Sequence, residues 1–536
     1  MSDALPLDPP PPTAAPDPPI PWLGLAAVLL GTFISTLNGR LSTFGLADIR
    51  GALHAGFDDG AWITTAQTVA QMLIAPVAIW IGGVYGPRRA LLEAALAFAV
   101  ISAIIPFSAN LPMFLGLQFI GGLASGFFVP LTLGFILRAL PPKYWAYGVA
   151  IYALNLELSL NISASLEGWY VDHMSWRWIF WQNVPLALGM AACLHFGIAR
   201  TPPAPNAPRP DLYGLAAGGI GLALIYAGLD QGNRLDWLHS GEVVALLAAG
   251  GVLVAGFLLH ESRAHHPAVD LKVLFAAPLP RLLILIAFLR LTILSTAYLI
   301  PQYLQAVRGY RALEVGETLV WIAAPQLVFC PLAALFLRRT DPRLVASIGF
   351  IFVSVACLLV ARNLTPLWGS EQFLPSQLLQ AVGQSFALSG ILFFAVLHLR
   401  PEDALTFGGA VQTARLMGGQ LGQAFVVTLT RVRTQTASNL IGQHVRIGDG
   451  AVMDRLGAYA AVFRRTSDPA AAAGKAAAAL AGIIRSAAAT QGVIDSFVAV
   501  GALTAIALML VVAHKPAPIG PASHLPLFAS QRRAVL

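Results

Sequence analysis

The chain has 536 residues, of which 57% are hydrophobic and 11% charged, and its formal net charge is +7 at pH 7. Ordinary soluble domains contain roughly 25% charged residues, so this composition excludes a water-soluble globular protein. The positive charges form no compact Lys/Arg run, and we therefore expect no nucleic-acid partner. The three cysteines, Cys193, Cys330 and Cys357, lie in apolar stretches without metal-ligand spacing, so we expect no metal site.

Residues 1–21 contain nine prolines and no Lys or Arg, which predicts a disordered Pro-rich tail without the basic start of a cleaved signal. Apolar stretches follow, each long enough to cross a hydrocarbon core of ~30 Å as a helix. A helix is favoured in lipid because it satisfies its own backbone groups. We expect 14 transmembrane helices, at residues 22–47, 61–82, 89–109, 112–137, 145–166, 184–199, 212–229, 242–259, 281–302, 317–337, 343–361, 372–397, 405–430 and 493–513.

The Pro-rich segment 200–211 separates the first six helices from the others. Transporters often consist of two related bundles with the substrate site at their interface. We therefore predict an all-α polytopic membrane protein. Its expected parts are a tail at 1–21, a six-helix bundle at 22–199, a linker at 200–211, two additional helices at 212–259, a second six-helix bundle at 260–513 and a tail at 514–536.

The distribution of Lys and Arg predicts the orientation of the chain. If both termini are cytoplasmic, the cytoplasmic segments carry 16 Lys and Arg residues and the short outer loops carry 6. Cytoplasmic loops carry an excess of Lys and Arg, so this bias favours two cytoplasmic termini.

One long segment, 431–492, is predicted to lie outside the membrane on the outer side. Val452, Leu456, Tyr459 and Phe463 have the spacing of one helical face. The segment is either a solvated helical hairpin that caps the outer face or a docking surface for a partner protein.

Four stretches resemble the fourteen-helix drug:proton antiporter branch of the major facilitator superfamily, of the EmrB/QacA type. Residues 175–185 (SWRWIFWQNVP) are similar to the WRWxFxxNxP signature before helix six, and residues 229–237 to the LDxG…DW loop. Residues 301–305 (PQYLQ) resemble the PxYLQ segment, and residues 86–89 the end of the helix 2–3 motif. The resemblance covers essentially the whole chain.

The resemblance implies the major facilitator fold, with two six-helix bundles and two extra central helices. It also implies alternating access around a central cavity, with export driven by inward proton flow. Members from Gram-negative bacteria often work with a periplasmic adaptor protein and an outer-membrane channel. Segment 431–492 is the part that would contact such partners.

The chain departs from the antiporter motifs at the residues that usually couple transport to protons. Asn38 stands where helix one of the family carries an Asp, and Gly83 replaces the Asp of the helix 2–3 motif. Gln118 takes the place of the helix-four Arg, and residues 163–168 (SASLEG) replace the GPxxGG motif of helix five. Since Asn does not titrate at physiological pH, Asn38 cannot carry a proton.

Glu157 is the candidate that replaces the missing acid. It lies midway along the fifth helix and shares one face with Asn161 and Ser165. A charge at a helix centre costs about 2.5–3.5 kcal/mol on insertion scales, so it needs a partner, water or a function. We take Glu157 as the candidate proton carrier; the alternative is a structural Glu in a fixed ion pair with Arg40 or Arg415.

Three arginines also lie inside predicted helices, and a permanently charged Arg cannot carry the proton. Arg290 and Arg415 are candidates for binding an anionic substrate group or for tuning Glu157; the alternative for both is pairing with backbone carbonyls or a carboxylate. Arg40 either lines the cavity or extends outward to the membrane surface. The neutral residues that we expect in the same cavity are Asn38, Gln118, Asn161 and Gln412.

The chain contains no HExxH, Walker or nucleophile-elbow motif, so we expect a transporter rather than an enzyme, with no cofactor and the proton gradient as its energy source. We predict a secondary transporter of the bacterial inner membrane that exports amphipathic or hydrophobic small molecules. Its arginines favour anionic substrates. The alternatives are an uptake or facilitative transporter for organic anions, and a non-transporting sensor or scaffold on the same fold.

Overall fold

The computed structural model describes residues 20–200, 211–264, 267, 269, 271–276, 278–400, 403–446 and 448–517. All regular structure in this part of the chain is helical. The two predicted tails and the predicted linker lie mostly outside the described residues.

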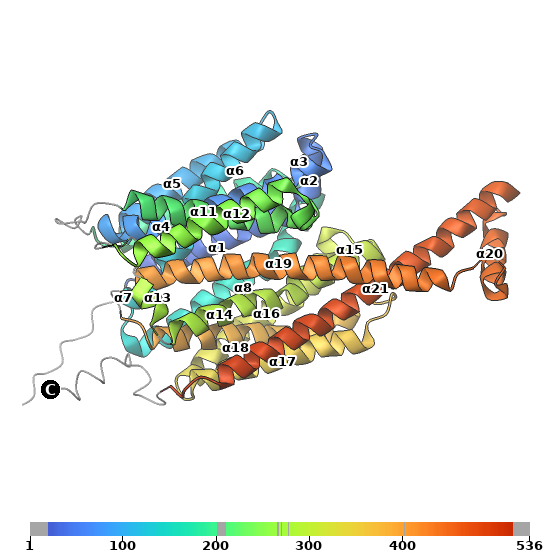
Figure 1. The fold of residues 1–536 in the computed structure, drawn as a ribbon. Coiled ribbons are helices and arrows are strands. Elements are labelled where there is room, and N and C mark those ends of the chain that lie inside the picture. Colours follow the sequence, from blue (N-terminus) through green and yellow to red (C-terminus); the bar gives the residue numbers. More distant parts are fainter. Residues whose placement is uncertain are drawn as a thin grey trace, which may run out of the picture.

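Residues 22–197 form a six-helix bundle (Figure 1). Short helices connect its long ones at one end. The long helices are α1 (Trp22–Phe44), α4 (Trp62–Val84), α5 (Pro87–Ile104), the pair α6 (Leu111–Ser125) and α7 (Phe128–Ala139), α8 (Trp145–His173) and α10 (Asn183–Gly197). The short ones are α2 (Leu46–Ala52), α3 (Phe57–Gly60) and α9 (Trp178–Trp181).

Two additional helices precede a second bundle. α11 lies against α12 and against α4 of the first bundle. In Figure 1 both additional helices, in green, are drawn in front of the first bundle. They are α11 (Leu212–Gly232) and α12 (Gly241–Glu261), followed by the short α13 (Leu271–Phe275). The second bundle contains α14 (Leu279–Thr292), a π-helical turn (Ser295–Leu299), α15 (Ile300–Arg308), α16 (Ala312–Leu337), α17 (Pro342–Asn363), α18 (Leu374–Val396), α19 (Ala404–Gln443) and α21 (Pro469–Val512).

Thirteen of the described helical segments are long and apolar enough to span a membrane. The fourteenth is α19, which lies among α4, α7, α14 and α21. It does not meet the same criterion because polar residues interrupt it, among them Gln412, Arg415 and Gln420. The prediction of a fourteen-helix membrane protein is confirmed.

The bundles have two ends, a tail face and an arm face. The tail face is the end at which α1 begins at Trp22 and α21 ends at Val512. The arm face is the opposite end, from which α19 and α21 extend beyond the bundles toward α20 (Gly450–Phe463) (Figure 1). This protruding part, residues 431–492, is called the arm.

The arm is helical but does not lie flat over the bundles as a cap. α19 continues 13 residues past the predicted end at 430, and α21 begins at Pro469 instead of 493. Asp468 caps α21 by accepting from the Ala471 amide, and the alanines that follow have the highest helix propensity. Within α20, the four residues of the predicted apolar face are the partly buried ones, as expected.

Two predicted helices are interrupted at prolines. α6 ends at Ser125 and α7 begins at Phe128, so the break at residues 126–127 lies three to four residues before Pro130. α14 ends at Thr292, and a π-helical turn precedes Pro301. A proline has no N–H for the carbonyl four residues earlier and clashes with it, which explains both interruptions.

Candidate functional site

A cavity lies between the two bundles, in the half of the molecule nearer the arm face. The residues of α1 and α11 that line it belong to the second half of each helix, and those of α4 to its first half. Its lining includes Ser35, Thr36, Gly39, Arg40, Thr43, Thr64, Thr68, Gln71, Leu160, Tyr226, Asp230, Arg290, Ile293, Leu294, Ala297, Arg415, Leu416, Gly419, Gln420 and Gln423. Its volume of about 170 Å³ is below the roughly 300–1,000 Å³ of ordinary ligand pockets, so a drug-sized ligand requires the bundles to separate further.

Arg40 reaches across the cavity from α1 to the second bundle. Its Nη2 donates to the carbonyl oxygen of Ala297, at 2.9 Å, and its guanidinium lies 5.1 Å from the ring centre of Phe44. Ala297 is the residue four before Pro301, which has no N–H to donate to this oxygen. Pro301 of the second bundle thus leaves the Ala297 carbonyl oxygen free to accept from Arg40 of the first bundle. Arg40 lines the cavity and does not extend outward to the membrane surface.

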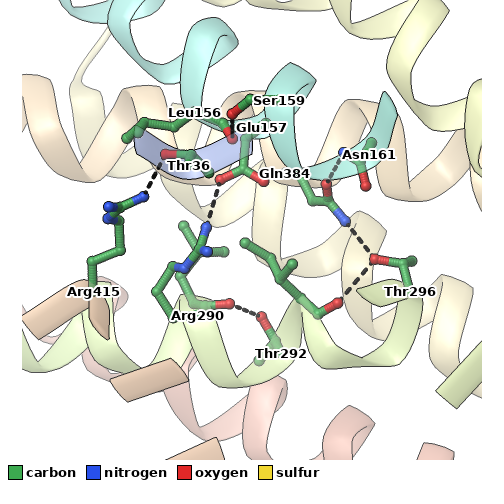
Figure 2. A network of polar contacts seen from close by, with 12 residues as sticks. Thr36, Leu156, Glu157, Ser159, Asn161, Arg290, Thr292, Thr296, Gln384 and Arg415 are labelled. Carbon is green, nitrogen blue, oxygen red and sulfur yellow. Dashed lines mark hydrogen bonds and ion pairs between the residues drawn. The ribbon is translucent and has the colours of Figure 1, made fainter. Parts of the chain in front are cut away.

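Arg290 and Glu157 form an ion pair between the bundles. Nη1 of Arg290 donates to Oε1 of Glu157 at 3.3 Å, as Figure 2 shows. Arg290 lines the cavity, whereas Glu157 is fully buried behind it and does not. The second carboxylate oxygen of Glu157 is buried without a partner among the described residues. Glu157 is therefore paired with Arg290, and neither Arg40 nor Arg415 holds it.

Arg415 of α19 is buried and lies against neutral groups. Its Nη1 donates to Thr36 Oγ1 at 3.1 Å (Figure 2), and its Nε and Nη2 donate to Gln412 Oε1 at 3.2 and 2.7 Å. It forms no ion pair within the described ranges of the chain. This guanidinium is a buried positive charge at the cavity wall whose hydrogen-bond partners are all neutral.

A network of amides lies beside the cavity, among the helices that join the bundles. Asn161 donates to Gln326 and Gln384, both at 3.2 Å. Gln384 in turn donates to Thr296 Oγ1 of the π-helical turn at 3.1 Å (Figure 2). Asn161 is buried in this network and does not line the cavity.

The remaining predicted residues lie away from the cavity lining. Asn38 is buried and accepts from Asn183 of α10 at 2.7 Å, within the first bundle. Gln118 is buried in α6 and has an amide nitrogen without a described partner. Gln412 contacts the site only by holding Arg415.

The cavity also contains an acid that the sequence analysis included in the LDxG…DW motif but did not count among the site residues. Asp230 lies near the end of α11, and the predicted end of this helix at 229 placed it in a loop. It accepts from Thr65 of α4 and, at 3.0 Å, from Gln420 of α19. The signal that could have identified it is an Asp one turn after Tyr226, continuous with the apolar stretch 212–229.

On the tail side of the cavity, α19 lies in close contact with the first bundle. A side chain at Gly408 of α19 would collide with the carbonyl oxygen of Pro130 on α7, and one at Gly409 would collide with Ile79 of α4. Glycine at these two positions lets α19 of the second bundle press against the first bundle. The conformation is closed toward the tail face.

The arrangement suits the binding of a charged amphiphile and the binding of a proton. Three guanidiniums and several hydroxyls face one cavity, with Ile293, Leu294 and Leu416 as apolar wall. Two carboxyl groups lie at this wall: Asp230 lines the cavity, and Glu157 is buried behind Arg290. No group of three or more His, Cys, Asp or Glu with metal-binding geometry occurs in the part of the chain that the structure describes.

Comparison with known proteins identifies the family. Residues 28–423, well over half of the chain, match the Major Facilitator Superfamily. The chain is 25% identical over 456 residues to the probable multidrug resistance protein EmrY of Escherichia coli (strain K12), covering 83% of this chain and 85% of EmrY. It is 22% identical over 432 residues to the fatty acid resistance protein FarB of Neisseria gonorrhoeae, covering 80% of this chain and 85% of FarB.

A solved structure shows the same fold. The proton:xylose symporter XylE bound to 6-bromo-6-deoxy-D-glucose aligns with a TM-score of 0.59 at 10% identity, over 96% of this chain and 99% of that chain. At this identity the likeness concerns the fold alone. The chain belongs to the major facilitator superfamily, and its similarity to EmrY places it in the EmrB/QacA-type branch of that superfamily.

Proposed function

We propose that this protein is a secondary transporter of the bacterial inner membrane that exports amphipathic small molecules in exchange for protons. The observation that carries the proposal is the set of charged residues at the interface of the bundles, Arg40, Arg290, Arg415 and Glu157, around one cavity. Ionisable groups within a membrane are costly and are retained where they serve transport. EmrY is named a probable multidrug resistance protein and FarB a fatty acid resistance protein, and resistance to such compounds is the result that their export would give.

In this proposal the tail face is cytoplasmic, because the loops on that side carry the excess of Lys and Arg. The cavity then lies in the outer half of the membrane. For substrate to be loaded from the cytoplasm, the contacts of Gly408 and Gly409 must open and the arm side must close. The small volume of the cavity supports a cycle in which the bundles move apart to admit substrate.

The anionic group of a substrate would bind Arg415 and Arg40. Both guanidiniums are hydrogen-bonded to neutral acceptors only, so a carboxylate, sulfonate or phosphate would supply the missing countercharge. Hydrogen bonds between charged groups contribute about 1.5–3 kcal/mol each. The apolar wall formed by Ile293, Leu294 and Leu416 would take the hydrophobic part of the molecule.

Glu157 would carry the proton, with Arg290 as the link between proton and substrate. In the paired state the guanidinium stabilises the carboxylate. When Glu157 is protonated, the pair weakens and Arg290 is free to turn toward the cavity. The unpartnered second oxygen of Glu157 supports this role, because it leaves a position for the proton.

The same pair favours one competing function, the uptake of organic anions together with protons. Protonation of Glu157 frees Arg290 for an anion, and by reciprocity a bound anion favours protonation. Such positive linkage moves proton and anion in the same direction. The sign of the linkage therefore decides between export by exchange and uptake by cotransport.

The arm would be the contact site for a periplasmic adaptor protein, and through it for an outer-membrane channel. Its long helices are held together by an ion pair between Arg433 of α19 and Asp495 of α21, at 2.6 Å. This pair fixes α19 and α21 relative to each other where the arm begins, and α20 lies at the far end of the arm. The proposal rests on this projection from the arm face and on the family resemblance.

Everted membrane vesicles test the transport proposal directly. Vesicles with the protein should accumulate an amphipathic fluorescent anion when their interior is acidified, and a protonophore should abolish accumulation. Vesicles without the protein are the control. Accumulation that is unaffected by the protonophore, or equal in both vesicle types, would reject proton-driven export.

A further inference from the structure

Asp230 is the carboxyl group that faces the cavity. It comes from α11, one of the two helices added to the two bundles, and it lies in the wall together with Tyr226 of the same helix. Glu157, in contrast, reaches the cavity only through Arg290. A cationic group inside the cavity can therefore contact Asp230 directly.

The partners of Asp230 are neutral. Its Oδ2 accepts from the Thr65 hydroxyl and, at 3.5 Å, from the amide of Gln231, and its Oδ1 accepts from Gln420 at 3.0 Å. Among the described residues Asp230 has no ion pair. Arg234, one turn later, instead pairs with Asp58 at 3.0 Å.

The groups that face Asp230 from the neighbouring helices do not titrate. α4 contributes the Thr65 hydroxyl, and α19 contributes the Gln420 amide. The titratable or charged groups near Asp230 on its own segment are Tyr226 and Arg234. The cavity wall also carries Arg40, Arg290 and Arg415. Among the described residues Asp230 pairs with none of them, and its hydrogen-bond partners are all neutral.

Arg415, on the same helix as Gln420, is a positive charge with a similar environment. It donates to Thr36 and Gln412, so it too has only neutral hydrogen-bond partners. A charge in a site shielded from water is costly unless it is paired. A ligand that brings a negative group to Arg415 and a positive group to Asp230 therefore gains binding energy from both contacts.

Both charges are held in part by α19. Arg415 belongs to this helix, and Gln420, whose amide donates to Asp230, follows it by five residues, or about 7.5 Å along a helix axis. Leu416 and Ile293 lie in the lining of the same cavity and offer apolar contact. A matching ligand therefore has an anionic group, a cationic group and an apolar body.

We propose that the cavity binds zwitterionic amphiphiles, with the anionic group on Arg415 and the ammonium group on Asp230, and that the ammonium competes there with a proton. This inference rests on the proposed function and names its substrate class. In the exchange, a protonated Asp230 releases its proton to water and the carboxylate pairs with the arriving ammonium. When the ammonium leaves, a proton takes its place.

Export by exchange requires that substrate binding and proton binding oppose each other, and competition at Asp230 meets this requirement. Substrate and proton exclude each other there, whereas an anion and the proton on Glu157 favour each other. The additional helix α11 would in this way supply a coupling group to a chain whose helix-one position is occupied by Asn38. The competing explanation is structural: Asp230 fastens α11 to α4 and α19 through its hydrogen bonds.

Binding measurements on the purified protein in nanodiscs separate the two explanations. The probes are octanoate, octylamine and N-octyl-4-aminobutyrate, which share one alkyl chain and differ in charge. Isothermal titration in two buffers of different ionisation enthalpy gives the affinity and the number of protons released. For the wild-type protein we expect the zwitterion to bind at least tenfold more tightly than either single-charge probe, with release of protons.

The Asp230→Asn variant should bind the zwitterion at least tenfold more weakly, bind octanoate more tightly and release no proton. Asp230→Glu should restore the preference for the zwitterion. Asp236→Asn is the matched control, because Asp236 belongs to the same segment but pairs with Arg431 on the arm side. It should behave as the wild type.

Each contrary outcome has a distinct meaning. If Asp230→Asn weakens all three probes equally, Asp230 is a structural fastener and the inference is wrong. If octanoate is bound and transported but the zwitterion binds no more tightly, the inference fails and the proposed function stands. If the wild-type protein binds and transports none of the probes, both are rejected.

Discussion

Arg290 on α14 and Glu157 on α8 join the two bundles through a 3.3 Å ion pair directly behind the cavity wall. Arg290 belongs to that wall, and Glu157 does not. Any event in the cavity that attracts the guanidinium therefore acts on the carboxyl group. This relationship makes the pair the centre of the account and leads to the first prediction.

Glu157→Gln should weaken the dependence of transport on the pH gradient, because a glutamine cannot take up a proton, whereas Asp230 still can. Accumulation of the fluorescent anion in everted vesicles, with and without acidification, measures the effect. If Glu157→Gln vesicles still respond to the gradient as the wild type does, Glu157 is not the proton carrier.

The stability of the same variant gives a second, independent prediction. Removing one partner of a buried ion pair costs about 3–5 kcal/mol, because the other charge is left unpaired. Glu157→Gln should therefore lower the unfolding temperature, and the double variant with Arg290→Gln should recover it. A recovery of stability without recovery of transport would separate the structural from the functional role of the pair.

Arg415→Gln should weaken the binding of amphipathic anions roughly 10- to 100-fold, which corresponds to the loss of a charged hydrogen bond of about 1.5–3 kcal/mol. The unfolding temperature should not fall, because the buried guanidinium has no charged partner to leave behind. Titration with octanoate and thermal unfolding measure the two effects. Arg89→Gln, in an exposed pair with Glu93, is the control; equal losses in both variants would contradict a binding role for Arg415.

Gly408→Leu should prevent closure of the tail side, since a side chain at this position collides with the Pro130 carbonyl. Export should stop, and a cysteine placed at Gly419 in the cavity should become reactive toward an impermeant thiol reagent from the tail face. Gly83→Leu is the control, because its position is open. Normal export by Gly408→Leu would show that the contact is no part of the cycle.

Replacing residues 444–468 with a flexible Gly/Ser linker removes α20 while leaving the cavity intact. If the arm binds an adaptor, cells with this variant should lose resistance to exported compounds, whereas accumulation in everted vesicles should remain. Resistance assays and vesicle assays on the same variant make the comparison. Unchanged resistance would exclude an adaptor role for α20.

The sequence predicted the fold well because membrane spans leave a strong apolar signal. It placed α1 and α12 within a few residues of their observed bounds. It ended α19 and began α21 at the membrane boundary, because hydropathy does not report where an Ala-rich, well-capped helix continues into water. The interruption before Pro301 needed the structure, although the proline itself was visible.

The site was predicted in part for a similar reason. A buried charge such as Arg415 is conspicuous in an apolar stretch, so the sequence identified the charged residues. It could not tell that Glu157 meets Arg290, because residue spacing does not determine which helices are neighbours. Asp230 was missed because it stands at the end of an apolar run, where an acid normally marks the start of a loop.

The direction of proton movement that a substrate gradient drives is the most direct test of export by exchange. Proteoliposomes that contain a pH dye receive an external pulse of N-octyltaurine, whose sulfonate group keeps it from crossing the bilayer unaided. Exchange moves protons outward as substrate flows inward, whichever way the protein is inserted. The account predicts that the interior becomes alkaline, relative to protein-free liposomes; acidification, or no change, would contradict it.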